Sequence, residues 1–298
     1  MSNKKPPFIR RVFHKLLCLS ASLYSDEFFI KMRFYLVMGK KLDLKNPRTY
    51  NEKLQWLKLH DKRPEYTNMV DKIEAKNYVA SVIGEEYIIP TIKIYNSIEE
   101  VNFDELPQQF VIKCSHDSGG VVVCKDKDKL DKKAALTMLS KSLKQNFNYL
   151  TREYPYKNVV PRLLVEQYME DESGYELKDY KIFCFDGKPK FSFVASDRQK
   201  EGEETKFDFY DLEWKHIPVV NGHECSEHGI EKPKNYEKML ELAAKLSYGI
   251  PHVRVDLYNI NGAIYFGELT FFHWSGLVPF EPEEWDYTFG NYLHLPPV

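Results

Sequence analysis

The stretch Arg254-Val-Asp256-Leu-Tyr-Asn-Ile-Asn-Gly262-Ala-Ile-Tyr-Phe-Gly-Glu268-Leu-Thr270 decides the fold of the C-terminal part of the chain. Its two apolar runs flank an Asn-Gly pair, a strong signal for the turn of a β-hairpin. Arg254 and Asp256 are two residues apart and therefore point to the same face of their strand. Carboxylates on an apolar sheet are costly unless a cation neutralises them. A divalent cation held by Asp256 and Glu268 beside Arg254 accounts for this pattern and suits chemistry on a polyphosphate. The alternative is a structural Arg-Asp-Glu cluster at a sheet edge.

Length and composition limit the classes of protein that fit this chain. Its 298 residues, 43% of them hydrophobic, are enough for one large domain or two to three small ones. The net charge of -2 provides no global basic field, so we expect no nucleic-acid partner. The 5 cysteines form no Cys-x-x-Cys pair, which indicates free, buried thiols in a reducing compartment and argues against a zinc site.

The N-terminal segment is both basic and apolar. Residues 1–45 carry ten Lys or Arg and three acidic residues, a balance of +7 that leaves -9 for the rest of the chain. No apolar run reaches the roughly 20 residues that span a bilayer, and residues 8–24 lack the continuous apolar core of a signal peptide. The simpler interpretation is a helix packed on the body with a solvated basic face. The other is a basic amphipathic helix that lies on an anionic membrane. We expect a cytoplasmic protein, and the second interpretation adds peripheral contact with the inner membrane face.

Periodicity and turn signals predict an α+β protein with antiparallel hairpins around a cleft. Helices are expected at residues 8–39, 49–60, 71–83, 132–146 and 236–248. Strands are expected at residues 90–95, 110–114, 120–124, 163–168, 180–185, 189–195 and 207–210, followed by the opening hairpin. The order suggests a helical N-terminal extension (1–60), an N-terminal lobe (61–105), a central subdomain with a glycine-rich loop (106–165) and a C-terminal lobe with the metal site (166–298).

A second motif combines a lysine with a glycine loop. Phe110-Val-Ile-Lys-Cys-Ser-His-Asp-Ser-Gly-Gly-Val-Val-Val123 reads as a strand, a small polar loop and another strand. Glycines let backbone N–H groups approach and cradle phosphate oxygens, and Lys113 would add a point charge. A lysine in an apolar strand just before such a loop favours phosphate binding over a merely exposed strand residue. His116 and Asp117 are expected to shape the loop.

Two further motifs could supply polar groups to the same cleft. The apolar strand that ends at Glu166 predicts an adenine-binding edge, where this carboxylate accepts from the amino group of the base, or else a strand that runs into a surface loop. Lys72 and Lys76 would share one face of the helix at 71–83. That face either contacts phosphate or is simply solvated.

Residues beyond these strands are candidates for substrate contact. Lys181 heads an apolar strand and Arg198 follows the next one, so both could reach the cleft unless Asp179 pairs with a neighbouring cation. The segment Phe271-Phe-His-Trp-Ser-Gly276 follows the acidic hairpin and would form the floor or rim of its pocket. In it, His273 and Ser275 could contact a carboxylate substrate, and at least one of the aromatic residues is expected in the core.

Taken in order, these motifs resemble the TupA-like family of the ATP-grasp superfamily, named for teichuronopeptide synthesis. The resemblance covers roughly residue 45 to the end, and the ordered set is far more specific than any single motif. The matching segments are Asn46-Pro-Arg-Thr-Tyr-Asn-Glu-Lys-Leu-Gln-Trp-Leu57, Val70-Asp-Lys72, Leu106-Pro-Gln-Gln-Phe-Val-Ile-Lys-Cys-Ser-His116, Asp179-Tyr-Lys-Ile-Phe-Cys-Phe-Asp-Gly-Lys-Pro189 and Gly267-Glu-Leu-Thr270.

The resemblance implies an ATP-grasp fold, in which two α+β lobes grip ATP and Mg²⁺. It implies that Lys72 and Lys113 contact phosphates, that Ser118 to Gly120 form a lid loop and that residues 166–169 line the adenine slot. The whole implied ATP site consists of Lys72, Lys113, Ser115, Ser118, Gly119, Gly120, Val121, Glu166, Gln167, Tyr168, Met169 and Lys181.

The resemblance also assigns the metal and catalytic residues. Asp256 and Glu268 would bind Mg²⁺, and Arg254, helped by Lys113 and Lys181, would steady the transferring phosphoryl group. Thr270 stands where many ATP-grasp enzymes place Asn, so a Thr hydroxyl or a water would replace that metal ligand. Lys76 stands where relatives often carry Arg.

The implied reaction is ATP-dependent ligation of a carboxylate to an amine through an acyl phosphate. The family association suggests a uronic acid of a bacterial surface polysaccharide, or its precursor, as the carboxylate and an amino acid or similar amine as the nucleophile. One alternative is a glycosyltransferase, for which Asp126-Lys-Asp128 matches the Asp-x-Asp string but lies in a charged turn. Another is a non-catalytic ATP-binding protein.

Overall fold

A computed structural model describes residues 6–117, 119–198 and 202–297 of the chain. Its α-helices are α1 (Phe8–Leu19), α2 (Asp26–Met38), α3 (Tyr50–His60), α4 (Tyr66–Val70), α5 (Glu74–Ile83), α6 (Lys132–Leu143), α7 (Phe147–Thr151), α8 (Tyr236–Leu246) and α9 (Glu284–Tyr292). Its strands are β1 (Thr91–Tyr95), β2 (Phe110–Cys114), β3 (Val121–Cys124), β4 (Leu163–Gln167), β5 (Asp179–Phe185), β6 (Lys188–Ser196), β7 (Lys206–Tyr210), β8 (His216–Ile217), β9 (His252–Ile260) and β10 (Ala263–Thr270).

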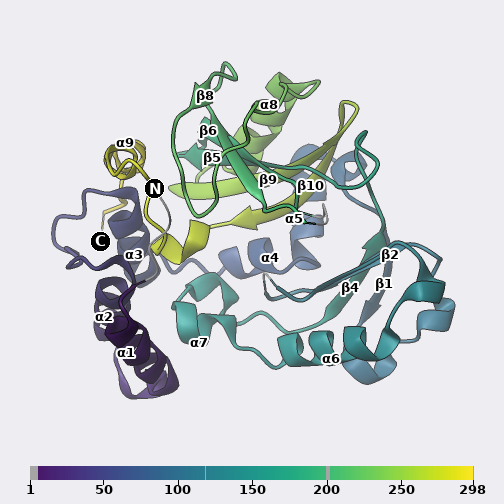
Figure 1. Cartoon of the computed structure of the whole chain (residues 1–298), viewed down its shortest axis with the longest axis horizontal. Helices are drawn as coiled ribbons and strands as arrows, with labels where there is room; N and C mark the ends of the chain where they lie inside the picture. Colours follow the sequence, from purple (N-terminus) through teal and green to yellow (C-terminus); the bar gives the residue numbers. More distant parts are fainter. Residues whose placement is uncertain (1–5, 118, 199–201, 298) are drawn as a thin grey trace.

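The strands form two antiparallel sheets that face each other across the middle of the molecule (Figure 1). The smaller sheet has the order β1-β4-β2-β3, and the larger has the order β10-β9-β5-β6-β7-β8. The predicted α+β architecture is therefore confirmed, including the opening hairpin, which is β9 and β10. The predicted boundary between residues 165 and 166 falls inside β4.

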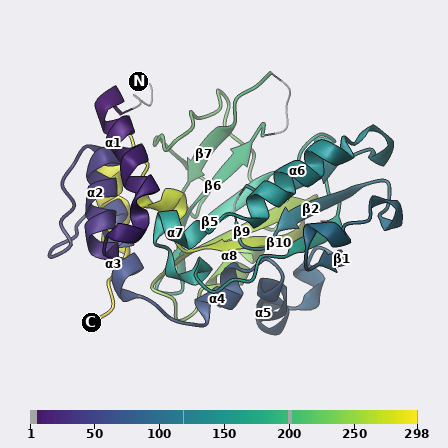
Figure 2. The ribbon, with the colours of Figure 1, turned by 90° about the horizontal axis from the view of Figure 1, so that it is seen from below.

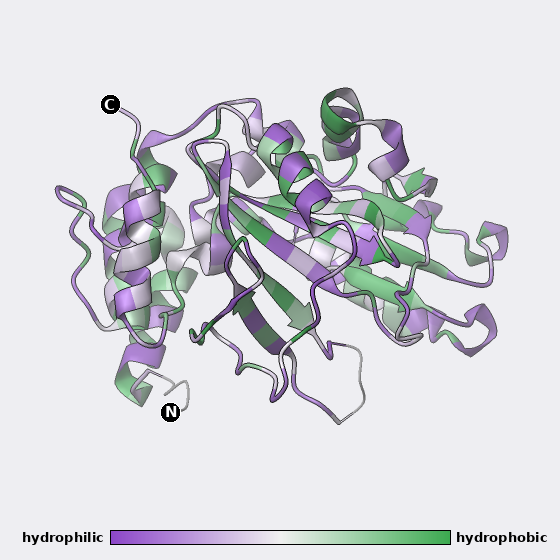
Figure 3. Cartoon of the chain, turned by 90° about the horizontal axis from the view of Figure 1, so that it is seen from above, coloured by the Kyte–Doolittle hydropathy of each residue, from purple (hydrophilic) through white to green (hydrophobic). Residues whose placement is uncertain are grey.

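Each sheet has its own hydrophobic core, and the strands carry most of the hydrophobic colour in Figure 3. Helix α8 covers one face of the large sheet because Met239, Leu242, Ala243 and Leu246 recur at helical spacing and are buried. Helix α6 crosses the small sheet and buries Ala135 and Leu139 there (Figure 2). The two cores leave the facing surfaces of the sheets free to carry polar groups.

Helix α3 belongs to the main body rather than to a separate extension. It begins with the predicted N-cap, in which Thr49 accepts from the N–H of Glu52 while Glu52 accepts from the N–H of Thr49. Tyr50 and Leu54 lie in the core of the large sheet. Gln55 donates to the carbonyl oxygen of Gly276, so this helix also fixes the segment that follows β10.

Two helix predictions were wrong in their extent. The helix expected at 8–39 is broken, because Ser25 caps a new helix by accepting from the N–H of Phe28 at 3.3 Å. The helix expected at 71–83 starts only at Glu74, after the separate helix α4. Lys72 thus lies in the turn before α5 and does not share a helix face with Lys76.

Two other expectations concern free cysteine thiols and membrane-spanning segments. All five cysteines are free. Among the described residues, every helix is too short or too polar to cross a membrane.

Candidate active site

A cleft of about 430 Å³ opens between the two sheets. The small-sheet side contributes aliphatic side chains and Lys113, and the large-sheet side contributes most of the charged groups. The lining residues are Lys72, Ile89, Val111, Lys113, Val121, Val123, Glu166, Gln167, Tyr168, Met169, Leu177, Asp179, Lys181, Arg198, Tyr258, Gly267 and Glu268. Most residues of the predicted ATP site are therefore brought together.

Strand register places the predicted metal and catalytic residues on one face of the large sheet. Asp256 of β9 stands opposite Lys181 of β5 on one side and opposite Glu268 of β10 on the other. Arg254 stands opposite Thr270. Because directly paired residues of antiparallel strands point to the same face, the hairpin and β5 build a single charged surface.

A β-bulge at Gly267 brings Glu268 into this register. The pairing of β10 with β9 shifts between Phe266 and Glu268, so one residue of β10 is extra. A Cβ on Gly267 would lie 3.1 Å from the carbonyl oxygen of Asp256 and 3.3 Å from the ring of Tyr258. This close approach favours glycine, and the bulge is what sets the second carboxylate opposite the first.

Arg254 organises the charged surface. Its Nε and Nη2 donate to the two carboxylate oxygens of Asp256, each at 2.7 Å. Nη2 also donates to Thr270 Oγ1 at 3.0 Å and to Glu268 Oε1 at 3.3 Å, and the Thr270 hydroxyl donates to the same Glu268 oxygen at 3.1 Å. Asp256 is fully buried, whereas the side chain of Glu268 is 37% exposed in the cleft.

Electrostatics keep Glu268 ionised. Burial alone would raise the pKa of its carboxyl group, but Lys181, Lys72 and Arg254 act more strongly and hold the pKa below its ordinary value. Lys181 is in turn held between two carboxylates, because its Nζ donates to Asp179 at 2.6 Å and also contacts Asp256. The cleft thus presents alternating charges rather than a field of one sign.

His273 lies behind Arg254 and not at the rim of the cleft, which corrects its prediction as a substrate contact. It is 2% exposed, and its Nδ1 accepts from Arg254 Nη1 at 2.6 Å. Its Nε2 donates to Asn221 Oδ1 at 2.8 Å. Burial and Arg254 lower the pKa of His273 well below its ordinary value, so the ring is neutral and can accept this hydrogen bond. His273 therefore positions Arg254.

Ser275 is also committed elsewhere. Its Oγ accepts from Lys58 Nζ at 2.7 Å, and its carbonyl oxygen accepts from Lys58 and Gln55 at 2.9 Å each. It does not line the cleft. The polar groups of Ser275 join β10 to α3, and the prediction that it contacts substrate is not supported by its position.

Glu166 takes a different role from the one predicted. Its two oxygens pair with Lys76 at 2.6 Å and with Lys113 at 2.7 Å. Burial would raise the pKa of Glu166, but the two lysines hold it below its ordinary value. A carboxylate already held by two cations is a poor acceptor for an adenine amino group. It instead aims Lys113 into the cleft, where the following Gln167, Tyr168 and Met169 form part of the wall.

Hydrogen bonds of Ser115 and Asp117 hold the glycine loop in place. Ser115 is fully buried, and its hydroxyl donates to the Val160 carbonyl oxygen at 3.2 Å, so it shapes the loop instead of facing the cleft. Asp117 accepts from the N–H of Gly120 at 3.1 Å and contacts the Ser142 hydroxyl, and its carbonyl oxygen contacts Lys72 Nζ. Asp117 therefore shapes the loop as predicted. Ser118 lies outside the described residues.

Asp179 is a site residue that the sequence reasoning treated only as a structural ion-pair partner. Its Oδ2 pairs with Lys181 at 2.6 Å and with Arg198 at 3.2 Å. Its Oδ1 is buried without a hydrogen-bond partner among the described residues, and the side chain lines the cleft. The Asp-x-Lys spacing on β5 was the available signal, because it places Asp179 and Lys181 on one face.

These oxygen donors fit Mg²⁺, which prefers carboxylates and water. Asp179, whose buried Oδ1 has no hydrogen-bond partner among the described residues, and Glu268 both line the cleft, and Asp256 lies directly beside Glu268. Asp256 gives both oxygens to Arg254 and Lys181 here, so it can take a metal only by sharing an oxygen with these cations. Glu268 is accordingly the better-placed ligand, and Thr270 serves Arg254 and Glu268.

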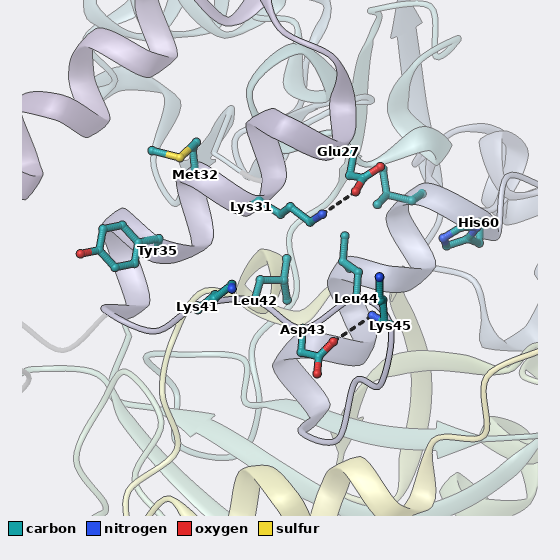
Figure 4. A pocket seen from close by; sticks show the side chains of 11 residues that line it. Glu27, Lys31, Met32, Tyr35, Lys41, Leu42, Asp43, Leu44, Lys45 and His60 are labelled. Atoms are coloured by element: carbon teal, nitrogen blue, oxygen red, sulfur yellow. Dashed lines mark hydrogen bonds and ion pairs between the residues drawn. The ribbon is translucent and has the colours of Figure 1, made fainter.

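A second hollow, of about 910 Å³, lies between α2 and residues 41–45 near the N-terminus (Figure 4). It shares no lining residue with the cleft. Lys31 in its wall is neutralised by Glu27 at 2.5 Å. Without paired strands that carry carboxylates, this hollow has no arrangement comparable to that of the cleft, and we assign the chemistry to the cleft.

The chain was compared with protein families and with solved structures. Residues 52–294 match the family model described as TupA-like ATPgrasp. Among solved structures, D-alanine–D-alanine ligase from Bacillus anthracis complexed with ATP is 18% identical, with 68% of this chain and 53% of that chain covered and a TM-score of 0.40. The ATP-grasp ligase PsnB complexed with minimal precursor, Mg and ADP is 12% identical, with 74% and 57% covered and a TM-score of 0.38. D-Alanine–D-alanine ligase from Helicobacter pylori is 15% identical, with 76% and 61% covered and a TM-score of 0.38.

The chain thus spans between about half and three fifths of the length of these ligases. A comparison with curated proteins gave no match. The family match confirms the predicted ATP-grasp family and, with it, the predicted ATP-grasp fold.

The glycine loop provides a matched pair of variants. A Cβ on Gly120 would lie 2.5 Å from Ser142 Oγ and 2.6 Å from Cys114 Sγ, whereas one on Gly119 meets nothing within 4 Å. We expect Gly120→Ala to destabilise the protein by about 1–3 kcal/mol in urea unfolding, as overpacking does. Gly119→Ala should change stability by less than about 0.5 kcal/mol. Equal effects of the two substitutions would contradict the described packing of the loop.

Proposed function

The chain belongs to the TupA-like ATP-grasp family, and we propose that it is an ATP-dependent carboxylate–amine ligase. In this proposal a carboxylate is activated as an acyl phosphate and an amine then forms an amide. The carboxylate is a uronic acid of a bacterial surface polysaccharide or its precursor, and the amine is an amino acid or a similar compound. The substrate part of the proposal rests on the association of the family with teichuronopeptide synthesis.

One observation carries the proposed reaction type. A cation and a group of carboxylates face each other across the cleft. The small sheet contributes Lys113, whose ammonium group pairs with Glu166. The large sheet contributes the ionised Glu268, with Asp256 and Arg254 beside it. A polyphosphate with its metal ion needs both a cationic partner for its oxygens and carboxylates for the metal. The alternating charges of the cleft supply both.

The residues support a two-step transfer. In the first step a substrate carboxylate oxygen attacks the γ-phosphorus of ATP, the bond to the β-phosphate oxygen breaks and ADP leaves. In this proposal Lys113, Lys181 and Arg254 offset charge on the transferring group. Mg²⁺, held by Glu268 with Asp256 and Asp179 beside it, would supply further charge neutralisation when bound.

In the second step the neutral amine attacks the acyl carbon, inorganic phosphate leaves and the ammonium proton is lost. The buried histidine beside the cleft is not the base for this proton, because His273 has both ring nitrogens in hydrogen bonds. In this proposal the glycine loop, in which the Asp117 carbonyl oxygen contacts Lys72 Nζ, would exclude water from the acyl phosphate, which water would otherwise hydrolyse.

The rival functions predict different behaviour. Asp126, part of the string that matches the Asp-x-Asp motif of glycosyltransferases, is a partly exposed residue that pairs with Lys129 at 3.1 Å and does not line the cleft. A non-catalytic ATP-binding protein would have no need for the buried set around Arg254. The paired carboxylates on β9 and β10 would serve the metal of ATP in a binding protein as well, so turnover rather than ATP binding separates that rival from the ligase.

An isotope experiment tests the acyl phosphate directly. Purified protein with ATP and Mg²⁺ would be given a panel of uronic acids and amino acids, with the carboxylate oxygens carrying a heavy isotope. We expect carboxylate-dependent ADP release and transfer of one labelled oxygen into inorganic phosphate, because the oxygen that attacks ATP leaves with the phosphate. Asp256→Asn and Glu268→Gln should abolish both signals, while the exposed Glu241→Gln in α8 should leave them intact. ADP release without label in the phosphate would contradict the ligase mechanism.

The N-terminal helix gives the proposal a second component, contact with an anionic membrane that carries the precursor. In α1 the exposed apolar residues share one face, with Phe8 76%, Ile9 67% and Leu19 72% exposed. That face spans an arc of about 140°, because Val12, Phe13 and Leu16 fall between the others at helical spacing.

The rest of α1 agrees with an interfacial position. Arg11 and Lys15 are exposed along one edge of the apolar arc, where they could reach anionic headgroups. Leu17 points the other way and is buried against Phe29 of α2, so the helix is anchored to the protein. The helix is therefore packed on the body, as the simpler interpretation predicted, but it presents an apolar face rather than a solvated basic one.

Vesicle co-sedimentation tests this component. We expect the full chain to sediment with vesicles that contain phosphatidylglycerol and much less with pure phosphatidylcholine. Substitution of Phe8, Ile9 and Phe13 by Ser should remove most of the binding, while Tyr248→Ser, at a residue 85% exposed outside α1, should not. Unchanged sedimentation of the triple variant would exclude α1 as the contact.

A further inference from the structure

A second group of metal-type ligands lies on the far face of the large sheet. Asp208 of β7, His216 of β8 and Cys225 of the following loop each bring one ligand atom to within 4.8 Å of the others. Asp208 pairs with Val194, which pairs with Tyr180. Tyr180 is the neighbour of Lys181 on β5, so Asp208 points away from the ATP cleft.

Two buried polar atoms at this cluster have no hydrogen-bond partner among the described residues. Asp208 is fully buried, and its Oδ1 accepts from the N–H of Ser226 at 3.1 Å, but its Oδ2 is unpartnered. The hydroxyl oxygen of Ser226 is buried and unpartnered as well. A buried polar oxygen without a hydrogen-bond partner is costly, so two such atoms on residues joined by a hydrogen bond point to a missing partner.

We propose that Asp208, His216 and Cys225 bind one Zn²⁺ ion, with a water in the fourth position that hydrogen-bonds to Ser226. The ion would neutralise the buried carboxylate of Asp208, one oxygen of which is unpartnered, and its water would satisfy the hydroxyl of Ser226. This site is separate from the Mg²⁺ of the ATP cleft.

Ligand chemistry and spacing select zinc. A set of one thiolate, one imidazole and one carboxylate suits Zn²⁺, whereas Mg²⁺ takes oxygen ligands. Bonds of roughly 2.0–2.3 Å in a tetrahedron place ligand atoms about 3.5 Å apart. His216 Nε2 already lies 3.7 Å from Asp208 Oδ1, and its side chain is 40% exposed and therefore free to adjust. The three ligand atoms lie within 4.8 Å of one another, so they would have to approach by about 1 Å to reach the spacing of a zinc tetrahedron.

The ion would fasten a long loop to the edge of the sheet. Residues 218–235, between β8 and α8, contain only isolated β-bridges. Loops of this length without secondary structure are uncommon in compact domains and usually have a function or an anchor. Asn221 of this loop holds His273, which positions Arg254, so the loop also supports the active site. The sequence argued against a zinc site because it contains no Cys-x-x-Cys pair. The proposed site uses a single cysteine, which only the fold brings close to Asp208 and His216.

Cobalt substitution and zinc affinity test the site on the full chain. Protein freed of metal and dialysed would be titrated with Co²⁺, and we expect about one equivalent to produce the intense visible bands of a tetrahedral ion and a thiolate-to-cobalt charge-transfer band. Zn²⁺ should displace the cobalt. Because loss of even an outer ligand partner costs roughly 10- to 100-fold, His216→Gln and Cys225→Ser should each weaken Zn²⁺ binding by at least about tenfold.

Controls separate this site from the others. Cys18→Ser, at a half-buried cysteine in α1, and Asp256→Asn, in the ATP cleft, should leave the cobalt spectrum unchanged. His216 is partly exposed, so its variant should fold even if changes at the buried Asp208 do not. Absence of Zn²⁺ binding, a cobalt spectrum without the thiolate band, or equal affinity of Cys225→Ser and the unmodified chain would overturn the proposal.

Discussion

The buried ion pair of Arg254 with Asp256 is the constraint on which the rest of the site depends. Arg254 is 7% exposed and Asp256 is fully buried, and they are joined by two hydrogen bonds of 2.7 Å. Removing two charges from water costs several kcal/mol per ion, and such a pair is seldom a net gain in stability. We explain this ion pair by the proposed ATP and metal site rather than by stability, because the guanidinium that neutralises Asp256 also donates to Glu268 and Thr270. One side chain thus holds the three oxygen-bearing side chains that are candidates for the metal.

The surrounding structure holds this pair in place from outside the cleft. His273 accepts from Arg254 and donates to Asn221, and the segment that carries His273 is fastened to α3 through Ser275 and Gly276. Helix α3 therefore supports the charged surface of the large sheet. A loop on the far side of the sheet contributes through Asn221, so the proposed zinc site and the ATP cleft share one chain of contacts.

Features that depend on strand alternation and turn residues could be predicted from the sequence. The hairpin of β9 and β10, its Asn-Gly turn and the shared face of Arg254 and Asp256 follow from strand alternation and turn chemistry. The glycine loop after Lys113 was recognisable for the same reason. These features depend on neighbours in the chain, which a sequence displays directly.

Other features depend on partners distant in the chain and could not be predicted in the same way. Glu166 was expected to bind adenine because nothing in its own strand shows that Lys76 and Lys113 converge on it. His273 was expected at the rim because it follows the acidic hairpin in the sequence. Its hydrogen bond to Arg254 depends on how β10 pairs with β9, which the residues around His273 do not show. The Asp208 set joins two strands and a loop, and the break after α1 depends on the capping by Ser25.

The central claim is that the two facing charged surfaces form one site for ATP and Mg²⁺. Calorimetric titration of ATP into the purified chain, with and without Mg²⁺, tests it most directly, with Glu268→Gln as the variant and Glu241→Gln as its control. The account predicts ATP binding that needs Mg²⁺ and Glu268, with at least about a tenfold loss of affinity, or 1.4 kcal/mol, when either is removed. Absence of ATP binding, or binding that is indifferent to both, would contradict it.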